Sequence, residues 1–176
     1  MDKKKKIVRL TTAGESLDDL LIGQLKYLNQ YFDIIAVAKD DGRLQKVRKR
    51  EGVRVVDAPI ERPISLLKDI IALRWLINFF KQEKPWCVHA NTPKGSLLAM
   101  VAAWICRVPH RIYTVTGLRY QGATGKFKFV LQTMERITCA CATKVIPEGQ
   151  GVLKTLKNDH ITNKPLEVIL NGNING

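Results

Sequence analysis

Short apolar runs alternate with longer amphipathic segments along the whole chain, and this alternation constrains the fold more than any other feature. Seven apolar runs predict strands, at residues 6–12, 33–38, 53–56, 86–88, 112–115, 144–146 and 167–170. Helical periodicity between them predicts a helix with Ser16 as its N-cap, a helix after Thr92, and helices over 43–50, 66–80, 127–141 and 149–157. Strands that alternate with helices form a mostly parallel sheet with helices on both faces. The sequence therefore predicts an α/β, Rossmann-like domain with a sheet of about seven strands.

Length and composition fit one domain that spans residues 1–176. A chain of 176 residues with 45% hydrophobic residues is long enough to bury a core of its own. No apolar run approaches the roughly 20 residues that span a bilayer, and the first residues lack the pattern of a secretory signal. The four cysteines lack the paired spacing of zinc sites, which favours buried, reduced thiols and no bound metal. These features predict a cytoplasmic protein.

The formal net charge is +13, and the excess of basic side chains lies mostly in the later part of the chain. Residues 63–176 contain 15 Lys and Arg against 6 Asp and Glu. Such a balance favours an anionic partner, and nucleic acid, an acidic membrane surface and a phosphorylated substrate remain as alternatives. Charge alone does not choose among them.

Polar side chains and glycines follow three of the predicted strands at the points where those strands end. Gly14 and Glu15 follow the first strand, an Asn-Thr-Pro-Lys turn follows the fourth, and a Gly-Leu-Arg-Tyr turn follows the fifth. Open α/β sheets bind ligands at the carboxyl ends of their strands. We therefore expect residues 86–125 to form half of a binding cleft.

The turn after the fourth strand can be interpreted in detail, because Thr92 fits a helix N-cap and Pro93 fits the first helical position. Lys94 then lies in the first turn, where the helix dipole disfavours a cation. Two explanations stay open: an anion or a polyol shares the site with Lys94, or its long side chain reaches water. His89 also has two interpretations, as a cleft residue that exchanges hydrogen bonds with a ligand or as a structural histidine.

Catalytic motifs are missing from the sequence. It contains no Walker A motif and no recognisable series of nucleophile, histidine and acid, and Glu15 has no second carboxylate beside it. After Gly149 and Gly151, Lys154 stands where a dinucleotide fingerprint needs its third glycine. The polar groups available are hydroxyls, amides, lysine and arginine, which bind more readily than they catalyse. We therefore assign no catalytic residue and expect no cofactor.

Two segments together resemble a known family. The sequence HANTPKGSLL at 89–98 and the sequence VPHRIYTVTGLRYQG at 108–122 are similar to the amino-terminal domain of bacterial family 4 glycosyltransferases. This GT-B group builds capsular and other surface polysaccharides, and residues 15–28 and 168–176 are similar to it too. The resemblance implies a two-domain, retaining enzyme of hexosyl transfer, in which this half of the GT-B fold holds the acceptor. The half that binds the nucleotide sugar is absent from these residues, so we expect the chain to be inactive alone.

The resemblance also implies roles for individual positions. Matched by position, the acceptor-binding residues are those of the loops after the first, fourth and fifth strands: Gly14, Glu15, His89, Asn91, Thr92, Lys94, Thr116, Gly117, Arg119 and Tyr120. Many relatives have a histidine near the end of the fifth strand where this chain has Thr116, and whether Thr116 takes over the role of that histidine stays open. An acceptor domain of this kind chiefly positions a hydroxyl for the reaction and needs no strong base of its own.

The implied acceptor is a growing glycan linked to polyprenyl diphosphate at the inner surface of the plasma membrane, which would account for the positive charge. Phe127 and Phe129, with Lys126 and Lys128, are expected at an anionic membrane surface, which makes the protein cytoplasmic and peripheral. Pairing of two copies stays open. Two other functions compete, a basic α/β module that binds nucleic acid and a noncatalytic sugar-binding partner of a membrane assembly. Against nucleic acid, the aromatic residues lie in apolar helices and do not alternate with basic ones on a strand.

Overall fold

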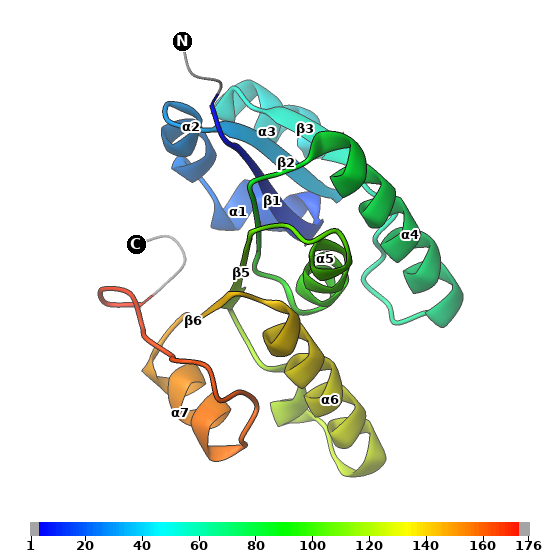
Figure 1. Cartoon of the computed structure of the whole chain (residues 1–176), viewed down its shortest axis with the longest axis vertical. Coiled ribbons are helices and arrows are strands. Elements are labelled where there is room, and N and C mark those ends of the chain that lie inside the picture. Colours follow the sequence, from blue (N-terminus) through cyan, green and yellow to red (C-terminus); the bar gives the residue numbers. More distant parts are fainter. Residues whose placement is uncertain (1–3, 173–176) are drawn as a thin grey trace.

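The computed structural model describes residues 4–172, which form a six-stranded parallel sheet with helices on both faces (Figure 1). The strands are β1 (Lys6–Ala13), β2 (Asp33–Lys39), β3 (Arg54–Asp57), β4 (Cys87–Ala90), β5 (His110–Val115) and β6 (Lys144–Pro147). Their order in the sheet is β3-β2-β1-β4-β5-β6, and all neighbouring strands are parallel. The predicted Rossmann-like fold is therefore confirmed.

The helices connect the strands and divide the core into two layers. They are α1 (Gly14–Leu20), α2 (Gln24–Asn29), α3 (Leu44–Glu51), α4 (Leu66–Glu83), α5 (Pro93–Ile105), the short 3₁₀-helix η1 (Arg119–Gly122), α6 (Gly125–Cys141) and α7 (Gln150–Asn158). Helices α4, α5 and α6 pack on one face of the sheet and enclose the larger core (Figure 1). On the other face, α1, α2 and α3 pack over β1 and β2, while residues 169–172 lie over the part that includes β6.

The seventh strand predicted at residues 167–170 is wrong. The sheet has six strands, and these residues run as irregular chain that pairs with no strand. Ile169 and Leu170 instead line a cavity together with Ile146 of β6. Ile169 and Leu170 are largely exposed, and the segment does not extend the sheet.

The start predicted for the first helix is also wrong. Helix α1 begins at Gly14 with Ala13 as its N-cap, so Ser16 lies within the helix and caps nothing. Strand β1 continues to Ala13, which leaves no loop residue between the strand and the helix. The polar residue after Ser16 that fixes the helix is Asp18, which is buried and forms an ion pair with Arg50 of α3 at 2.5 Å.

The first helical segment is interrupted where the sequence pattern predicts a continuous apolar face. Helix α1 ends at Leu20, and Gly23 has a φ of 75°, in the left-handed region that favours glycine. The backbone N–H groups of Gly23 and Lys26 donate to the two carboxylate oxygens of Glu51, each at 3.0 Å. The exposed amides at the start of α2 are thus satisfied by a side chain from α3, and no local capping pattern reveals this arrangement.

Candidate functional site

The loops after β1, β4 and β5 lie side by side, because these three strands are neighbours in the sheet. At their carboxyl ends they share an open pocket of about 280 Å³, which we call the strand-end pocket. Its lining residues are Thr12, Ser16, Arg62, Thr92, Pro93, Lys94 and Arg119. The structure therefore brings three of the predicted residues together, Thr92, Lys94 and Arg119.

Hydrogen bonds between threonines fix the floor of the strand-end pocket. The hydroxyl of Thr92 accepts a hydrogen bond from the backbone N–H of Thr12 and lies 2.8 Å from the Thr12 hydroxyl. The Thr12 hydroxyl also accepts from the N–H of Gly95, at 3.1 Å. Thr92 is the N-cap of α5 and Pro93 follows it, as predicted. These bonds join the end of β1 to the start of α5, so the pocket has a rigid base.

Lys94 follows neither of the two explanations that the sequence left open. Its side chain is buried, with 4% of its surface exposed, so it does not reach water. The ammonium group forms an ion pair with the carboxylate of Asp69 at 2.6 Å and donates a hydrogen bond to the carbonyl of Pro63. The charge of Lys94 is therefore neutralised inside the protein, because the first turn of α4 supplies an acid that the local sequence pattern does not reveal.

The loops after β4 and β5 are tied to each other. The hydroxyl of Thr116 donates to the carbonyl of Asn91 at 2.6 Å. The Asn91 side chain is fully buried, and neither of its amide atoms has a hydrogen-bond partner within residues 4–172. Gly117 follows in a half-buried position with open space around its Cα. Thr116 and Asn91 thus hold the loops together beneath the surface of the pocket.

Arg119 is the cation of the strand-end pocket that is most available to a ligand. It is exposed, and within residues 4–172 it forms no ion pair and no hydrogen bond through its side chain. Tyr120, the next residue, is buried, and desolvation is the main reason why its pKa lies well above its usual value. Tyr120 therefore supports the loop from below, and Arg119 faces the pocket.

A second open groove, of about 500 Å³, adjoins the strand-end pocket through Thr12 and Arg62. Glu15 lines it, and its carboxylate forms ion pairs with Arg62 and Arg43. Gly14 is buried, and a Cβ at this position would lie 2.6 Å from a carboxylate oxygen of Asp41. The space that Gly14 was predicted to leave for a ligand is therefore filled by an aspartate.

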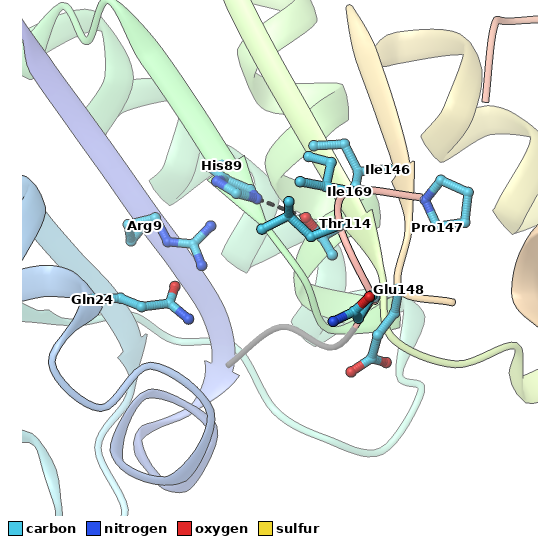
Figure 2. A pocket seen from close by; sticks show the side chains of 11 residues that line it. Arg9, Gln24, His89, Thr114, Ile146, Pro147, Glu148 and Ile169 are labelled. Atoms are coloured by element: carbon cyan, nitrogen blue, oxygen red, sulfur yellow. Dashed lines mark hydrogen bonds between the residues drawn. The ribbon is translucent and has the colours of Figure 1, made fainter. Parts of the chain in front are cut away.

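His89 does not line the strand-end pocket, and its predicted role in acceptor binding stays a prediction. It lies within β4, and its Nε2 is 2.8 Å from the Thr114 hydroxyl. Both side chains line a separate cavity on the sheet face opposite α5 (Figure 2). Burial, followed by the positive charge of Arg9, lowers the pKa of His89 well below its usual value, so the imidazole is neutral at pH 7.

Four lining residues of the strand-end pocket, Thr12, Ser16, Arg62 and Pro93, were not among the predicted site residues. Arg62 comes from the segment between β3 and α4, which returns across the end of β1. No spacing in the sequence indicates that path. Ser16 was taken for a helix cap, but its place one residue after Glu15 could have assigned it to the cleft.

Within the described residues, no three side chains of the metal-binding types come together, and no helix is both long and apolar enough to cross a membrane.

Comparison with known proteins matches residues 28–172 to the family described as "Glycosyl transferase 4-like domain". Over 160 residues, the chain is 36% identical to "Capsular polysaccharide biosynthesis glycosyltransferase CapM" of Staphylococcus aureus. The aligned region covers 91% of this chain and 40% of CapM. Over 120 residues, it is 32% identical to "UDP-Gal:alpha-D-GlcNAc-diphosphoundecaprenol alpha-1,3-galactosyltransferase" of Escherichia coli. This aligned region covers 67% of this chain and 31% of that protein. The chain thus spans less than half the length of either relative.

Among solved structures, HepE of Anabaena in complex with UDP and glucose has a TM-score of 0.70 and 18% sequence identity. The match covers 96% of this chain and 44% of HepE. At this identity the likeness concerns the fold alone, and it agrees with the Rossmann-like sheet described above.

Proposed function

The chain belongs to the glycosyl transferase 4-like domain family, and we propose that it is the acceptor-binding half of such a glycosyltransferase. These are the family 4 glycosyltransferases that its sequence resembles. The complete enzyme transfers a hexosyl group, with retention, from a nucleotide sugar to a growing surface polysaccharide. A second domain binds the nucleotide sugar, so the 176 residues alone transfer no sugar. This assignment replaces the nucleic-acid-binding alternative, for which net charge is the only argument.

The names of the relatives support a lipid-linked acceptor. The Escherichia coli relative carries the name of an enzyme that acts on a sugar joined to undecaprenol through a diphosphate. The Staphylococcus aureus relative carries the name of an enzyme of capsular polysaccharide biosynthesis. A substrate of this class has three chemically distinct parts, a sugar hydroxyl, a diphosphate and an apolar chain.

The observation that carries the proposal is the strand-end pocket, whose chemistry fits two of these parts. The Ser16 hydroxyl can exchange a hydrogen bond with a sugar, and Arg119 is a cation without a partner in the described chain. Guanidinium groups bind phosphate oxygens through paired hydrogen bonds. We assign the diphosphate to Arg119 and the acceptor sugar to the floor formed by Thr12 and Thr92.

The third part, the apolar chain, fits the surface beside the pocket. We call apolar rim the exposed apolar side chains at the starts of α4 and α6, namely Ile64, Leu66, Leu67, Ile70, Ile71, Phe127, Phe129 and Val130. Ile64, which precedes α4, and Leu131 of α6 line one small cavity together with Arg119, so parts of both segments lie next to the strand-end pocket. Figure 1 shows α4 and α6 on either side of α5. An enzyme held at the inner membrane surface by this rim would meet its acceptor there.

A transfer assay tests the proposal. The chain is joined to its donor-binding domain and supplied with nucleotide sugars and an acceptor sugar on a polyprenyl diphosphate. We expect Arg119→Ala to raise the acceptor KM by about 10-fold to 100-fold, because a hydrogen bond to a charged group contributes about 1.5 to 3 kcal/mol. The donor KM should stay unchanged, since the donor binds to the other domain.

The matched control is Lys157→Ala, which removes an exposed cation of α7 that lines none of the pockets described here. Its acceptor KM should equal that of the unchanged protein. An unchanged acceptor KM in Arg119→Ala would contradict the assignment of the strand-end pocket. Sugar transfer by the 176-residue chain alone would contradict the division of labour between two domains.

A further inference from the structure

The sheet face opposite α5 contains a cavity of about 310 Å³, and none of the residues of the strand-end pocket lines it (Figure 2). Arg9 of β1 is in register with His89 of β4, and Thr114 follows on the neighbouring strand β5. Residues 169–172 line the cavity as well. Three neighbouring strands therefore place polar side chains together on a face that is otherwise apolar.

Arg9 is the unusual residue of this cavity. Its side chain is almost fully buried, with 1% of the residue exposed. Its Nε and Nη1 atoms have no hydrogen-bond partner within residues 4–172, and no ion pair of the described chain includes it. In Figure 2 the guanidinium extends from β1 toward the space in front of His89 and Thr114. A buried guanidinium normally has both a counterion and hydrogen bonds, because desolvation of a lone charge is costly.

Two titratable neighbours of Arg9, Cys87 and His89, carry no negative charge. Burial raises the pKa of the Cys87 thiol to about 11, so this neighbour is protonated at pH 7. Burial lowers the pKa of Arg9 itself to about 10, which leaves the guanidinium charged. His89 is neutral, as described above. Glu148 also lines the cavity and brings a carboxylate to it.

Two other polar groups of the cavity, His89 and Thr114, suit an oxyanion. The Nε2 of His89 and the hydroxyl of Thr114 are 2.8 Å apart and share a hydrogen bond, in which the accepting group keeps its own hydrogen. With a neutral imidazole, this leaves the pair one hydrogen to donate to a ligand. A phosphate group presents several oxygen acceptors and matches the fork of a guanidinium. The cavity volume lies at the lower end of the range of about 300 to 1,000 Å³ that is typical of small-molecule sites. It therefore accommodates more than a single inorganic ion.

We propose that this cavity binds the phosphate group of a small molecule, with Arg9 as its counterion and with the hydrogen-bonded pair of His89 and Thr114 as the donor of one hydrogen bond. The site is separate from the strand-end pocket and does not depend on the proposed transferase function. A bound ligand would lie beneath residues 169–172 and contact them.

Binding is tested by calorimetry and by NMR of the histidine side chains, with inorganic phosphate, a hexose 1-phosphate and UDP as probes. An uncharged hexose is the negative control. Ionic strength is held constant, because a protein with a net charge of +13 attracts anions without any specific site. We expect saturable binding of at least one phosphate probe, accompanied by a shift of the His89 ring signals. The probe that binds with the highest affinity shows whether the site takes free phosphate, a sugar phosphate or a nucleotide.

Arg9→Met removes the charge and keeps a long side chain, and Arg48→Met removes an exposed arginine of α3 as the matched control. We expect Arg9→Met to weaken binding at least about tenfold and Arg48→Met to change it less than about twofold. Equal binding by Arg9→Met, or no shift of the His89 signals with any probe, would overturn the proposal. If Arg9→Met does not fold, the His89 signals of the unchanged protein decide the matter.

Discussion

Glu135 is a buried acid next to the strand-end pocket, and its environment makes stability depend on pH. It accepts a hydrogen bond from the Tyr113 hydroxyl at 2.6 Å, and it is 7% exposed. Burial raises its pKa from 4.5 to about 7, and the hydrogen bond from Tyr113 offsets only part of that effect. The folded protein therefore keeps this carboxyl protonated at a pH where the unfolded chain has already ionised it.

The sign of the effect follows from the two pKa values of Glu135. Its contribution to stability is complete below pH 4.5 and is lost as the pH rises through about 7. The shift corresponds to about 3 kcal/mol in the free energy of unfolding. Glu135→Gln keeps an oxygen acceptor for Tyr113 and cannot ionise, so this loss should disappear in the variant.

Urea unfolding at pH 5 and pH 8 measures the effect. The comparison with Glu135→Gln is needed because His89 titrates as well, and its lowered pKa acts in the opposite direction, reducing stability as the pH falls. In both proteins the His89 contribution is the same and cancels. Identical changes with pH in the two proteins would show that Glu135 is ionised in the folded state.

Which individual residues could be predicted depends on whether neighbours in sequence decide their surroundings. Thr92 was predicted as a cap because Pro93 follows it, and both are local features. His89 lies away from the strand-end pocket because side-chain direction alternates along a strand: Val88 and Ala90 pack in the core beneath α5, so His89 points to the other face. That His89 lies beside Arg9 depends on the register of β1 and β4, which no pattern in the sequence indicates. An arginine within an apolar strand was a visible signal that the analysis did not use.

At the scale of elements, the position of α5 depends on a close approach to β1. A Cβ on Gly95 would lie 2.7 Å from the Thr92 hydroxyl and 3.0 Å from the backbone nitrogen of Thr12. We expect Gly95→Ala to lower the free energy of unfolding by about 1 to 3 kcal/mol, because β1 cannot move away without breaking its ladder. Urea unfolding measures this loss.

The control for this prediction is Gly151→Ala in α7, where no heavy atom lies within 4 Å of the added Cβ. It should be neutral or stabilise the protein by up to about 1 kcal/mol, since alanine is the better helix former. Equal effects of the two substitutions would mean that close packing at Gly95 does not hold α5 in place.

Elements with strong local signals were predicted, and elements that depend on distant partners were not. The alternation of strands and helices was enough for the parallel sheet, because only one class of fold accommodates it. Residues 167–170 were mistaken for a strand because apolar alternation indicates that a segment is half buried and does not identify what it packs on. The break between α1 and α2 was missed because Glu51, which satisfies the amides of α2, lies on another helix.

At the scale of the whole molecule, the apolar rim and the positive charge lie together. The start of α6 exposes Phe127 and Phe129, and Lys126 and Lys128 alternate with them. Neither lysine forms an ion pair within residues 4–172, whereas many cations elsewhere are paired with acids. An exposed apolar surface bordered by unpaired cations is the pattern expected for binding to an anionic lipid surface.

We therefore expect the chain to sediment with vesicles that contain anionic phospholipid, and to do so less at high salt. Replacing Phe127 and Phe129 by serine should weaken binding by about 10-fold or more, because each buried phenyl group contributes about 1.5 to 3 kcal/mol when it is fully covered. Replacing Lys126 and Lys128 by glutamine should also weaken it by about 10-fold or more, at about 1 kcal/mol per charge. The second pair of substitutions should, in addition, reduce the dependence on salt.

The matched control is Trp104→Ser, which removes an exposed aromatic side chain near the end of α5, outside the apolar rim. Vesicle binding should not change in this variant, so a loss there would mean that any exposed aromatic residue suffices. Equal binding to neutral and anionic vesicles would contradict the role of the lysines.

The remaining alternative is that the apolar rim joins two copies of the chain. In that case sedimentation equilibrium without lipid would show a dimer that the serine variant lacks, and vesicle binding would not respond to the substitutions at Phe127 and Phe129.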